Sequence, residues 1–281
     1  MMNDPIANQL EESSVKTLLF LLRHEFQQSF IEWERRQPAR NGLHVASLVE
    51  PDEIWCARKH VILAFTPEYR QEVPAYWSLL AKFVHGWAIH TKWQHDLLKH
   101  TGLVAWNTEQ EKYELDLTHH DIDRDIHFSP DVILKFGNML IPLEIKGINH
   151  DEYAGHPAYY SLSGELIKEE VHGIAGATLQ EAMHRNKSVR GAVPQLNLYL
   201  HLLKLPLGII LVEDKNNQDF TLFTVEYSRE LAAPAAQRAS QVKAYVQVAR
   251  KRDVLPARCC SSPTESRAKQ CPVRDFCFKH E

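Results

Sequence analysis

The sequence predicts an α/β protein whose helices flank a small mixed sheet. Two apolar runs within residues 131–147 surround a Gly-Asn pair, a turn signal typical of a β-hairpin. Residues 193–204 have helical periodicity with Pro194 in the first predicted turn. The strand-like runs 207–213 and 220–227 follow on either side of a polar turn. Hairpin, helix and hairpin in this order indicate a sheet with helices packed against it.

The parts of the chain around this core have a helical pattern. Apolar residues recur at helical spacing over 12–35, a short helix fits 51–62, and a long aromatic-rich helix fits 75–100. A last helix is predicted over 228–252. The stretch 149–191 has no clear period, and we expect a loop or a partly helical insert over the functional site.

Composition and charge exclude several classes of protein. The 281 residues are 44% hydrophobic and 24% charged, which excludes wholesale disorder. The formal net charge of -4 excludes a cationic coat for nucleic acid, so any such contact needs a local patch. No apolar run approaches the roughly 18 residues of a membrane span, and the N-terminus has no secretory pattern. We therefore expect a soluble protein of the reducing cytoplasm.

The Gly137-Asn138 turn fixes a register for the hairpin. With these two residues as the loop, Phe136 faces Met139 and Asp131 faces Glu144. One face of the hairpin is then entirely apolar and is expected to pack in the core: Val132, Leu134, Phe136, Met139, Ile141 and Leu143.

The other face of the hairpin carries Asp131, Glu144 and Lys146. Directly opposed residues have Cβ atoms about 5 Å apart, and two carboxylates at that distance repel each other. A divalent cation between them would remove the repulsion. The alternative is a pair of partly solvated carboxylates with Lys146 as their ion-pair partner. The pattern therefore favours a cation site on this face.

Five cysteines are unevenly spread along the chain. Cys56 stands alone, whereas Cys259, Cys260, Cys271 and Cys277 lie together near the C-terminus. In a reducing compartment such a cluster indicates metal ligation rather than a disulfide framework.

These motifs together resemble a known nuclease superfamily. Asp131, then Glu144-Ile145-Lys146, then Gln195 and Tyr199 resemble the D, ExK and QxxxY motifs of the PD-(D/E)XK nucleases in their RecB-like branch. His90, four residues after a glycine, looks like the first motif of that branch. Cys56 and the C-terminal cysteines are similar to its iron-sulfur version, found in CRISPR adaptation exonucleases, the AddB nuclease domain and phage relatives.

The resemblance implies a restriction-endonuclease-like core, an N-terminal helical portion and a C-terminal cysteine-bearing tail. A single nuclease domain over 1–281 is expected. It would comprise a helical portion over 1–105 with Cys56 and His90, a catalytic core over 106–230, and a C-terminal helix with the metal-cluster tail over 231–281.

The resemblance further implies a metal-dependent DNA nuclease that hydrolyses phosphodiester bonds, most simply a single-strand exonuclease. Mn²⁺ or Mg²⁺ would be held by four groups: His90, Asp131, Glu144 and the main-chain carbonyl of Ile145. Lys146 would stabilise the attacking hydroxide and the negative transition state. Gln195 and Tyr199 would contact the DNA backbone or orient the metal ligands; the alternative for these two is the polar face of a surface helix.

The implied cofactor at the cysteines is a 4Fe-4S cluster, with zinc as the alternative. Its ligands would be Cys56, Cys271, Cys277 and either Cys260 or Cys259. Such a group would hold the C-terminal tail to the N-terminal helices.

The expected partner is DNA that is single-stranded or has free ends. Arg58, Arg185, Lys187 and Arg190 are candidates for phosphate contacts. No Walker-type loop is found, so a helicase or a recombination or CRISPR complex would supply unwinding in a bacterial or phage-infected cell. No membrane partner is expected. Two alternatives remain open: a structure-specific endonuclease, and a non-catalytic iron-sulfur subunit that binds DNA within a larger complex.

Overall fold

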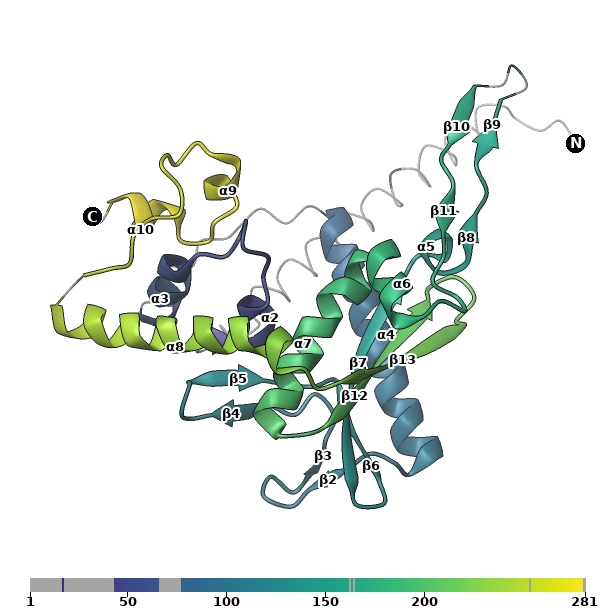
Figure 1. The fold of residues 1–281 in the computed structure, drawn as a ribbon, viewed down its shortest axis with the longest axis horizontal. Coiled ribbons are helices and arrows are strands. Elements are labelled where there is room, and N and C mark those ends of the chain that lie inside the picture. The colour runs from purple at the N-terminus through teal and green to yellow at the C-terminus, as the bar shows by residue number, and fades with distance from the viewer. Residues whose placement is uncertain are drawn as a thin grey trace, which may run out of the picture. The chain divides into compact units, whose positions relative to one another are not determined.

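The computed structural model describes residues 17, 43–65, 77–161, 163, 165–252 and 254–279 (Figure 1). The helix predicted over 12–35 lies outside the described residues, apart from Thr17. The chain divides into two compact units, one of Met1–Arg40 with Pro74–Val84 and one of Asn41–Val73 with His85–Glu281. The predicted site residues all belong to the second unit. A single nuclease domain stays a prediction.

The second unit is built on a four-stranded mixed sheet, as the sequence predicts. Its strands lie in the order β13-β12-β7-β6. Their bounds are β6 Val132–Phe136, β7 Met139–Ile148, β12 Leu207–Asp214 and β13 Phe220–Glu226. β7 and β12 are parallel, whereas β6 with β7 and β12 with β13 form antiparallel hairpins. The predicted α/β class with a mixed sheet flanked by helices is therefore confirmed.

The register of the β6–β7 hairpin agrees with the prediction. Val132 pairs with Leu143 and Phe136 pairs with Met139, so the turn consists of Gly137 and Asn138. Gly137 has φ +61°, a left-handed conformation that glycine adopts without steric cost. The period-2 alternation and the turn residue were enough to fix which side chains share a face.

The prediction that the whole apolar face of this hairpin packs in the core is wrong at its tip. Val132 and Leu143 are buried, but Phe136 is 66% exposed and Met139 is also exposed. The reason is that the hydrophobic cluster on this face of the sheet includes Val132, Leu134 and Leu143 but does not extend to Phe136 and Met139. Alternation of apolar and polar residues predicts which face of a strand is apolar. It does not predict how much of that face other elements pack against.

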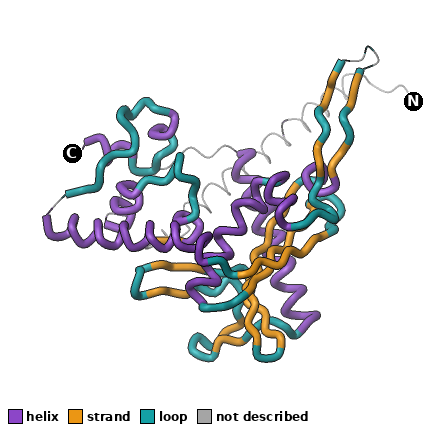
Figure 2. Tube along the Cα trace, in the orientation of Figure 1, coloured by secondary structure: helices purple, strands orange, loops and turns teal. Residues whose placement is uncertain are grey.

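Two helices enclose the sheet (Figure 2). α4 Trp77–Thr101 packs Ile89 and Trp93 against Ile145 and its neighbours on one face. α7 Lys187–Leu203 packs Val193 and Leu196 against the other face. Since neighbouring residues of β7 point to opposite faces, Ile145 lies on the α4 side and Glu144 and Lys146 lie on the α7 side.

α7 begins six residues before its predicted start. Asn186 caps the helix, because its side-chain oxygen accepts hydrogen bonds from the backbone N–H groups of Ser188 and Val189 at 2.8 and 3.1 Å. Pro194 therefore lies inside the helix and not in its first turn. The predicted start depended on Pro194 alone and overlooked the asparagine cap.

The C-terminal part packs on a short N-terminal segment. α8 Arg229–Arg252 agrees with its prediction and contacts α2 Val45–Leu48 and α3 Ala57–Phe65. The helix predicted over 51–62 starts later, because Pro51 opens a turn closed by the Ile54 N–H at 3.0 Å. α9 Ser266–Lys269 and α10 Arg274–Lys279 complete the tail.

The insert over 149–191 contains strands as well as helices. Its helices are α5 His150–Ala154 and α6 Leu179–Arg185, and its strands are β8 Gly155–His156, β9 Tyr159–Tyr160, β10 Leu166–Lys168 and β11 Val171–His172. β8 pairs with β11 and β9 pairs with β10, which makes a narrow antiparallel arm (Figure 1). The predicted loop or partly helical insert is therefore only half right.

Smaller strands lie beside the main sheet. β1 Leu43–His44, β5 Ile126–Phe128 and β4 His119–Asp121 form a three-stranded sheet, and β2 Trp106–Asn107 pairs with β3 Lys112–Tyr113. Within the described part of the chain, no helix has both the length and the apolar character that crossing a membrane requires.

Candidate active site

Asp131 and Glu144 come together where the hairpin joins the sheet. Asp131 immediately precedes β6, and its Oδ2 accepts a 2.6 Å hydrogen bond from the backbone N–H of Ile145. Glu144 in β7 is 1% exposed, and its Oε2 is buried without a hydrogen-bond partner among the described residues. A buried carboxylate oxygen with no donor is costly, and a bound cation would satisfy it.

Glu144 and Lys146 form a buried ion pair on the α7 side of the sheet. Burial and the negative charge of Asp131 raise the pKa of Glu144, Lys146 and His90 oppose them, and the net pKa is about 7. The Lys146 ammonium contacts Oε1 of Glu144. Burial lowers the pKa of Lys146, but the charges of Glu144 and Asp131 outweigh it, so the pKa is raised overall. Lys146 therefore stays charged at neutral pH.

Helix α4 places His90 beside the carboxylate of Asp131. Its Nδ1 lies 3.1 Å from Oδ1 of Asp131. Burial lowers the pKa of His90, but the hydrogen bond and charge of Asp131 raise it more, so the net shift is upward. One turn along α4, Gln94 donates from Nε2 to the main-chain oxygen of Asp131 at 2.9 Å. Helix α4 thus holds both the side chain and the backbone of Asp131.

The donor types at this position are those that hard divalent cations prefer. Two carboxylates and one imidazole are available from Asp131, Glu144 and His90, a combination that suits Mn²⁺ or Mg²⁺. Glu144 also retains a carboxylate oxygen without a donor. The N–H of Ile145 is used by Asp131, and a ligand role for the Ile145 carbonyl stays a prediction.

Gln195 and Tyr199 form a hydrogen-bonded pair on α7. Gln195 Nε2 donates to the Tyr199 hydroxyl at 2.9 Å, and that hydroxyl donates to the carbonyl of Ser129 at 3.2 Å. Burial raises the pKa of Tyr199 well above its usual value, and Glu144 adds to the shift. Tyr199 is buried, so this geometry favours a role in holding the segment before Asp131 over direct contact with DNA.

An anchor for α4 escaped the sequence analysis. Glu213 in β12 is buried and accepts from Lys92 Nζ at 2.6 Å and from the indole N–H of Trp93. Both donors follow His90 within one turn of α4. A signal was present, because Glu213 is an acidic residue at the end of an otherwise apolar strand. The neighbouring Asp214 is likewise buried and lies 2.6 Å from Nδ1 of His150.

All five cysteines line one cavity, although Cys56 is distant from the others in sequence. Cys56 directly precedes α3, and the other four, Cys259, Cys260, Cys271 and Cys277, lie in the tail. None is in a disulfide, and Cys259 Sγ lies 3.7 Å from Cys260 Sγ. Burial raises the pKa of the thiols of Cys56, Cys259 and Cys271. The structure therefore brings the segment around Cys56 and the cysteine-bearing tail together.

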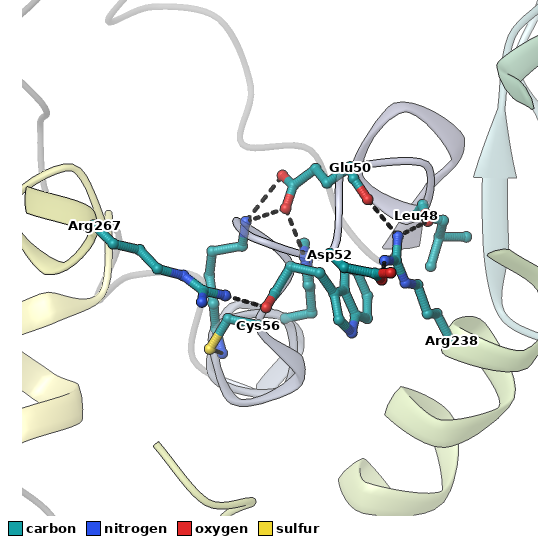
Figure 3. A network of polar contacts seen from close by, with 9 residues as sticks. Leu48, Glu50, Asp52, Cys56, Arg238 and Arg267 are labelled. Atoms are coloured by element: carbon teal, nitrogen blue, oxygen red, sulfur yellow. Dashed lines mark hydrogen bonds and ion pairs between the residues drawn. The ribbon is translucent and has the colours of Figure 1, made fainter. Parts of the chain in front are cut away.

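Polar contacts join the segment around Cys56 to α8 and to the tail (Figure 3). Arg267 donates to the carbonyl of Trp55, and Arg238 donates to the carbonyls of Leu48 and Glu50 at 2.8 and 2.5 Å. Arg238 also pairs with Asp52. These bonds hold the Cys56 segment beside the other thiols.

The candidate phosphate contacts are not equivalent. Arg58 is 3% exposed and donates to the carbonyls of Pro256 and Cys277 at 2.8 and 3.4 Å, so the expectation that it contacts phosphate is wrong. Arg185 is exposed but donates to the Gly173 carbonyl at 2.9 Å. Lys187 and Arg190 are exposed on α7 and remain candidates.

Comparison with known proteins gives likenesses of fold only. No family model matches the chain, and no curated protein matches it. The solved structure of SSO0001 is 13% identical, covers 91% of this chain and 96% of its own, and gives a TM-score of 0.44. An alkaline exonuclease (LHK-Exo) from Laribacter hongkongensis is 12% identical over 75% of this chain and 93% of its own, with a TM-score of 0.45. Its complex with dAMP is 11% identical over 75% and 92%, with a TM-score of 0.43. Because these TM-scores are below 0.5, function has to be argued from the site.

Proposed function

We propose that the protein is a metal-dependent deoxyribonuclease of the RecB-like PD-(D/E)XK type that degrades single-stranded DNA from its ends. The observation that carries the proposal is Glu144: a fully buried carboxylate beside Asp131, with one oxygen lacking a donor and a pKa near 7. Such a group destabilises the fold, which supports a role in holding a cation.

Each residue of the site has a role in this proposal. Asp131, Glu144 and His90 would hold Mn²⁺ or Mg²⁺, together with the Ile145 carbonyl. When bound, a divalent cation polarises the scissile phosphate and lowers the pKa of water. The charged Lys146 would stabilise the attacking hydroxide and the negative charge of the transition state. Tyr199 and Gln195 would position Asp131 through the carbonyl of Ser129.

The cysteines would hold a 4Fe-4S cluster that fixes the tail to the N-terminal segment. Support comes from the single cavity lined by Cys56 and the four tail cysteines, with Cys260 or Cys259 as the fourth ligand. Zinc with the same thiolates is the alternative outcome of metal analysis. Because a cluster needs four thiolates and five are present, substituting Cys259 and Cys260 in turn tests which of them is a ligand.

The proposed setting is the cytoplasm of a bacterial or phage-infected cell. The substrate would be DNA with free ends, and unwinding would come from a helicase or from a recombination or CRISPR complex. The exposed Lys187 and Arg190 would contribute phosphate contacts, so binding should weaken as salt rises.

The test is cleavage of end-labelled single- and double-stranded DNA by anaerobically purified protein, with Mn²⁺, Mg²⁺ or EDTA. Lys146→Ala should lose about 10²-fold or more of the activity while its DNA affinity, read by fluorescence anisotropy, is unchanged. Lys135→Ala is the matched control, because Lys135 is an exposed lysine of the same hairpin. If Lys146→Ala cleaves DNA as fast as Lys135→Ala and the wild type, the proposal is refuted. DNA binding without cleavage by the wild type would favour the non-catalytic subunit.

A further inference from the structure

A cross-strand pair of histidines lies on the β4–β5 hairpin, apart from the residues discussed so far. His120 of β4 and His127 of β5 are directly opposed in the antiparallel register. Their rings stack with centroids 4.1 Å apart and planes 4° from parallel. Both side chains therefore project from the same face of the hairpin.

A carboxylate from the turn completes the group. Asp125 lies in the loop between the two strands and has φ +57°, a left-handed conformation that is uncommon outside glycine. Its Oδ1 is 2.9 Å from Nε2 of His120. The ligand atoms of His120, Asp125 and His127 all lie within 4.8 Å of one another.

Two other charged side chains of the hairpin, Asp121 and Arg124, pair with each other. Asp121 accepts from the Arg124 side chain at 2.8 Å and from its backbone N–H at 2.9 Å. Lys243 of α8 donates to the carbonyls of Ile122 and Asp123 at 3.1 and 2.6 Å. These hydrogen bonds stabilise the loop backbone. The loop in turn holds Asp125 beside the histidines.

We propose that His120, Asp125 and His127 form a binding site for a divalent transition-metal ion such as Zn²⁺. Two imidazoles and one carboxylate are a ligand set that suits zinc, and the exposure of His120 and Asp125 leaves room for water as a fourth ligand. A simple ion pair would involve His120 and Asp125 only and would not require the imidazole of His127 beside them. An ion bound by both histidines would link the side chains of β4 and β5.

The proposal is tested by carbethoxylation of histidines in the full-length protein, with and without Zn²⁺, quantified by peptide mass spectrometry. Zn²⁺ should reduce the labelling of His120 and His127 several-fold. His172, an exposed histidine 3.6 Å from the carboxylate of Glu170, is the internal control and should label equally in both conditions. Equal labelling of His120 with and without Zn²⁺ would overturn the proposal.

Variants separate this site from the proposed nuclease site. Protection of His120 should disappear in His127→Ala and in Asp125→Ala, and circular dichroism checks that each variant is folded. The same protection should persist in Asp131→Asn, because that change affects only the proposed nuclease site. Full protection of His120 in folded His127→Ala would also refute the site. Neither result depends on the activity of the nuclease.

Discussion

The backbone N–H of Ile145 and the carboxylate of Asp131 are joined by a 2.6 Å hydrogen bond that crosses the hairpin. On its other oxygen, Asp131 meets the imidazole of His90 at 3.1 Å. Asp131 is therefore held from β7 and from α4 at once, with both oxygens engaged. Glu144 differs, because one of its oxygens meets Lys146 and the other has no donor among the described residues. The repulsion between the two carboxylates therefore mainly destabilises the ionised form of Glu144, whose pKa is raised.

Asp131→Asn should abolish cation binding and cleavage while leaving the fold intact. The amide has the same shape and can still accept from Ile145, but it lacks the charge that a divalent cation requires. Calorimetry with Mn²⁺ should detect no binding at this site, and cleavage should fall by about 10²-fold or more. Asp123→Asn, at an exposed loop position, is the control and should match the wild type. Unchanged Mn²⁺ binding by Asp131→Asn would contradict the assigned site.

Glu144→Gln should stabilise the metal-free protein at pH 8 and not at pH 4. The pKa of Glu144 is about 7 in the folded state against about 4.3 in an unfolded chain, so the folded state binds more protons between these values. Folding stability therefore falls as pH rises through this window, by about 4 kcal/mol at most. The substitution removes that penalty.

The measurement is urea unfolding of both proteins in EDTA across pH 4 to 8. The wild type should lose stability relative to Glu144→Gln as pH rises, and the two curves should converge at about pH 4. Glu165→Gln, a change at an exposed glutamate of the arm, should show no such divergence. A constant difference at every pH would mean that Glu144 does not titrate in this range.

The sequence predicted the parts of the site that depend on local rules. The register of Asp131 and Glu144 followed from alternation and the turn at Gly137, and the structure places His90 at the same carboxylates. The acidic Glu213 at the end of an apolar strand was visible in the sequence, but its role as an anchor was not, because its partners lie on another element. Arg58 was misjudged for the same reason, since its acceptors are main-chain oxygens about 200 residues away.

Cys259→Ser should retain the metal bound at the cysteine cavity, whereas Cys260→Ser should lose it. Cys260 is buried with Cys56 and Cys277, while Cys259 is exposed to solvent. A ligand thiolate held inside the cavity is better shielded from exchange and oxidation than one at its mouth. Iron, sulfide and zinc analysis of anaerobically purified protein, with visible absorption, gives the result. Loss of metal from Cys259→Ser alone would reverse the assignment of the fourth ligand.

Glu213→Ala should weaken both the fold and the activity, because Glu213 anchors helix α4 close to His90. The substitution leaves the indole N–H of Trp93 and the ammonium of Lys92 without their shared acceptor. Loss of a buried acceptor of this kind costs about 1 to 3 kcal/mol, which urea unfolding would detect.

The functional readout for Glu213→Ala separates anchoring from simple destabilisation. At a temperature where the variant is fully folded, a displaced α4 should lower kcat and weaken Mn²⁺ binding, because His90 and Gln94 position Asp131. DNA affinity should stay unchanged. Glu226→Ala, at an exposed position ending β13, is the matched control. If folded Glu213→Ala binds Mn²⁺ and cleaves DNA as the wild type does, the contact between Glu213 and α4 stabilises the fold without positioning the site.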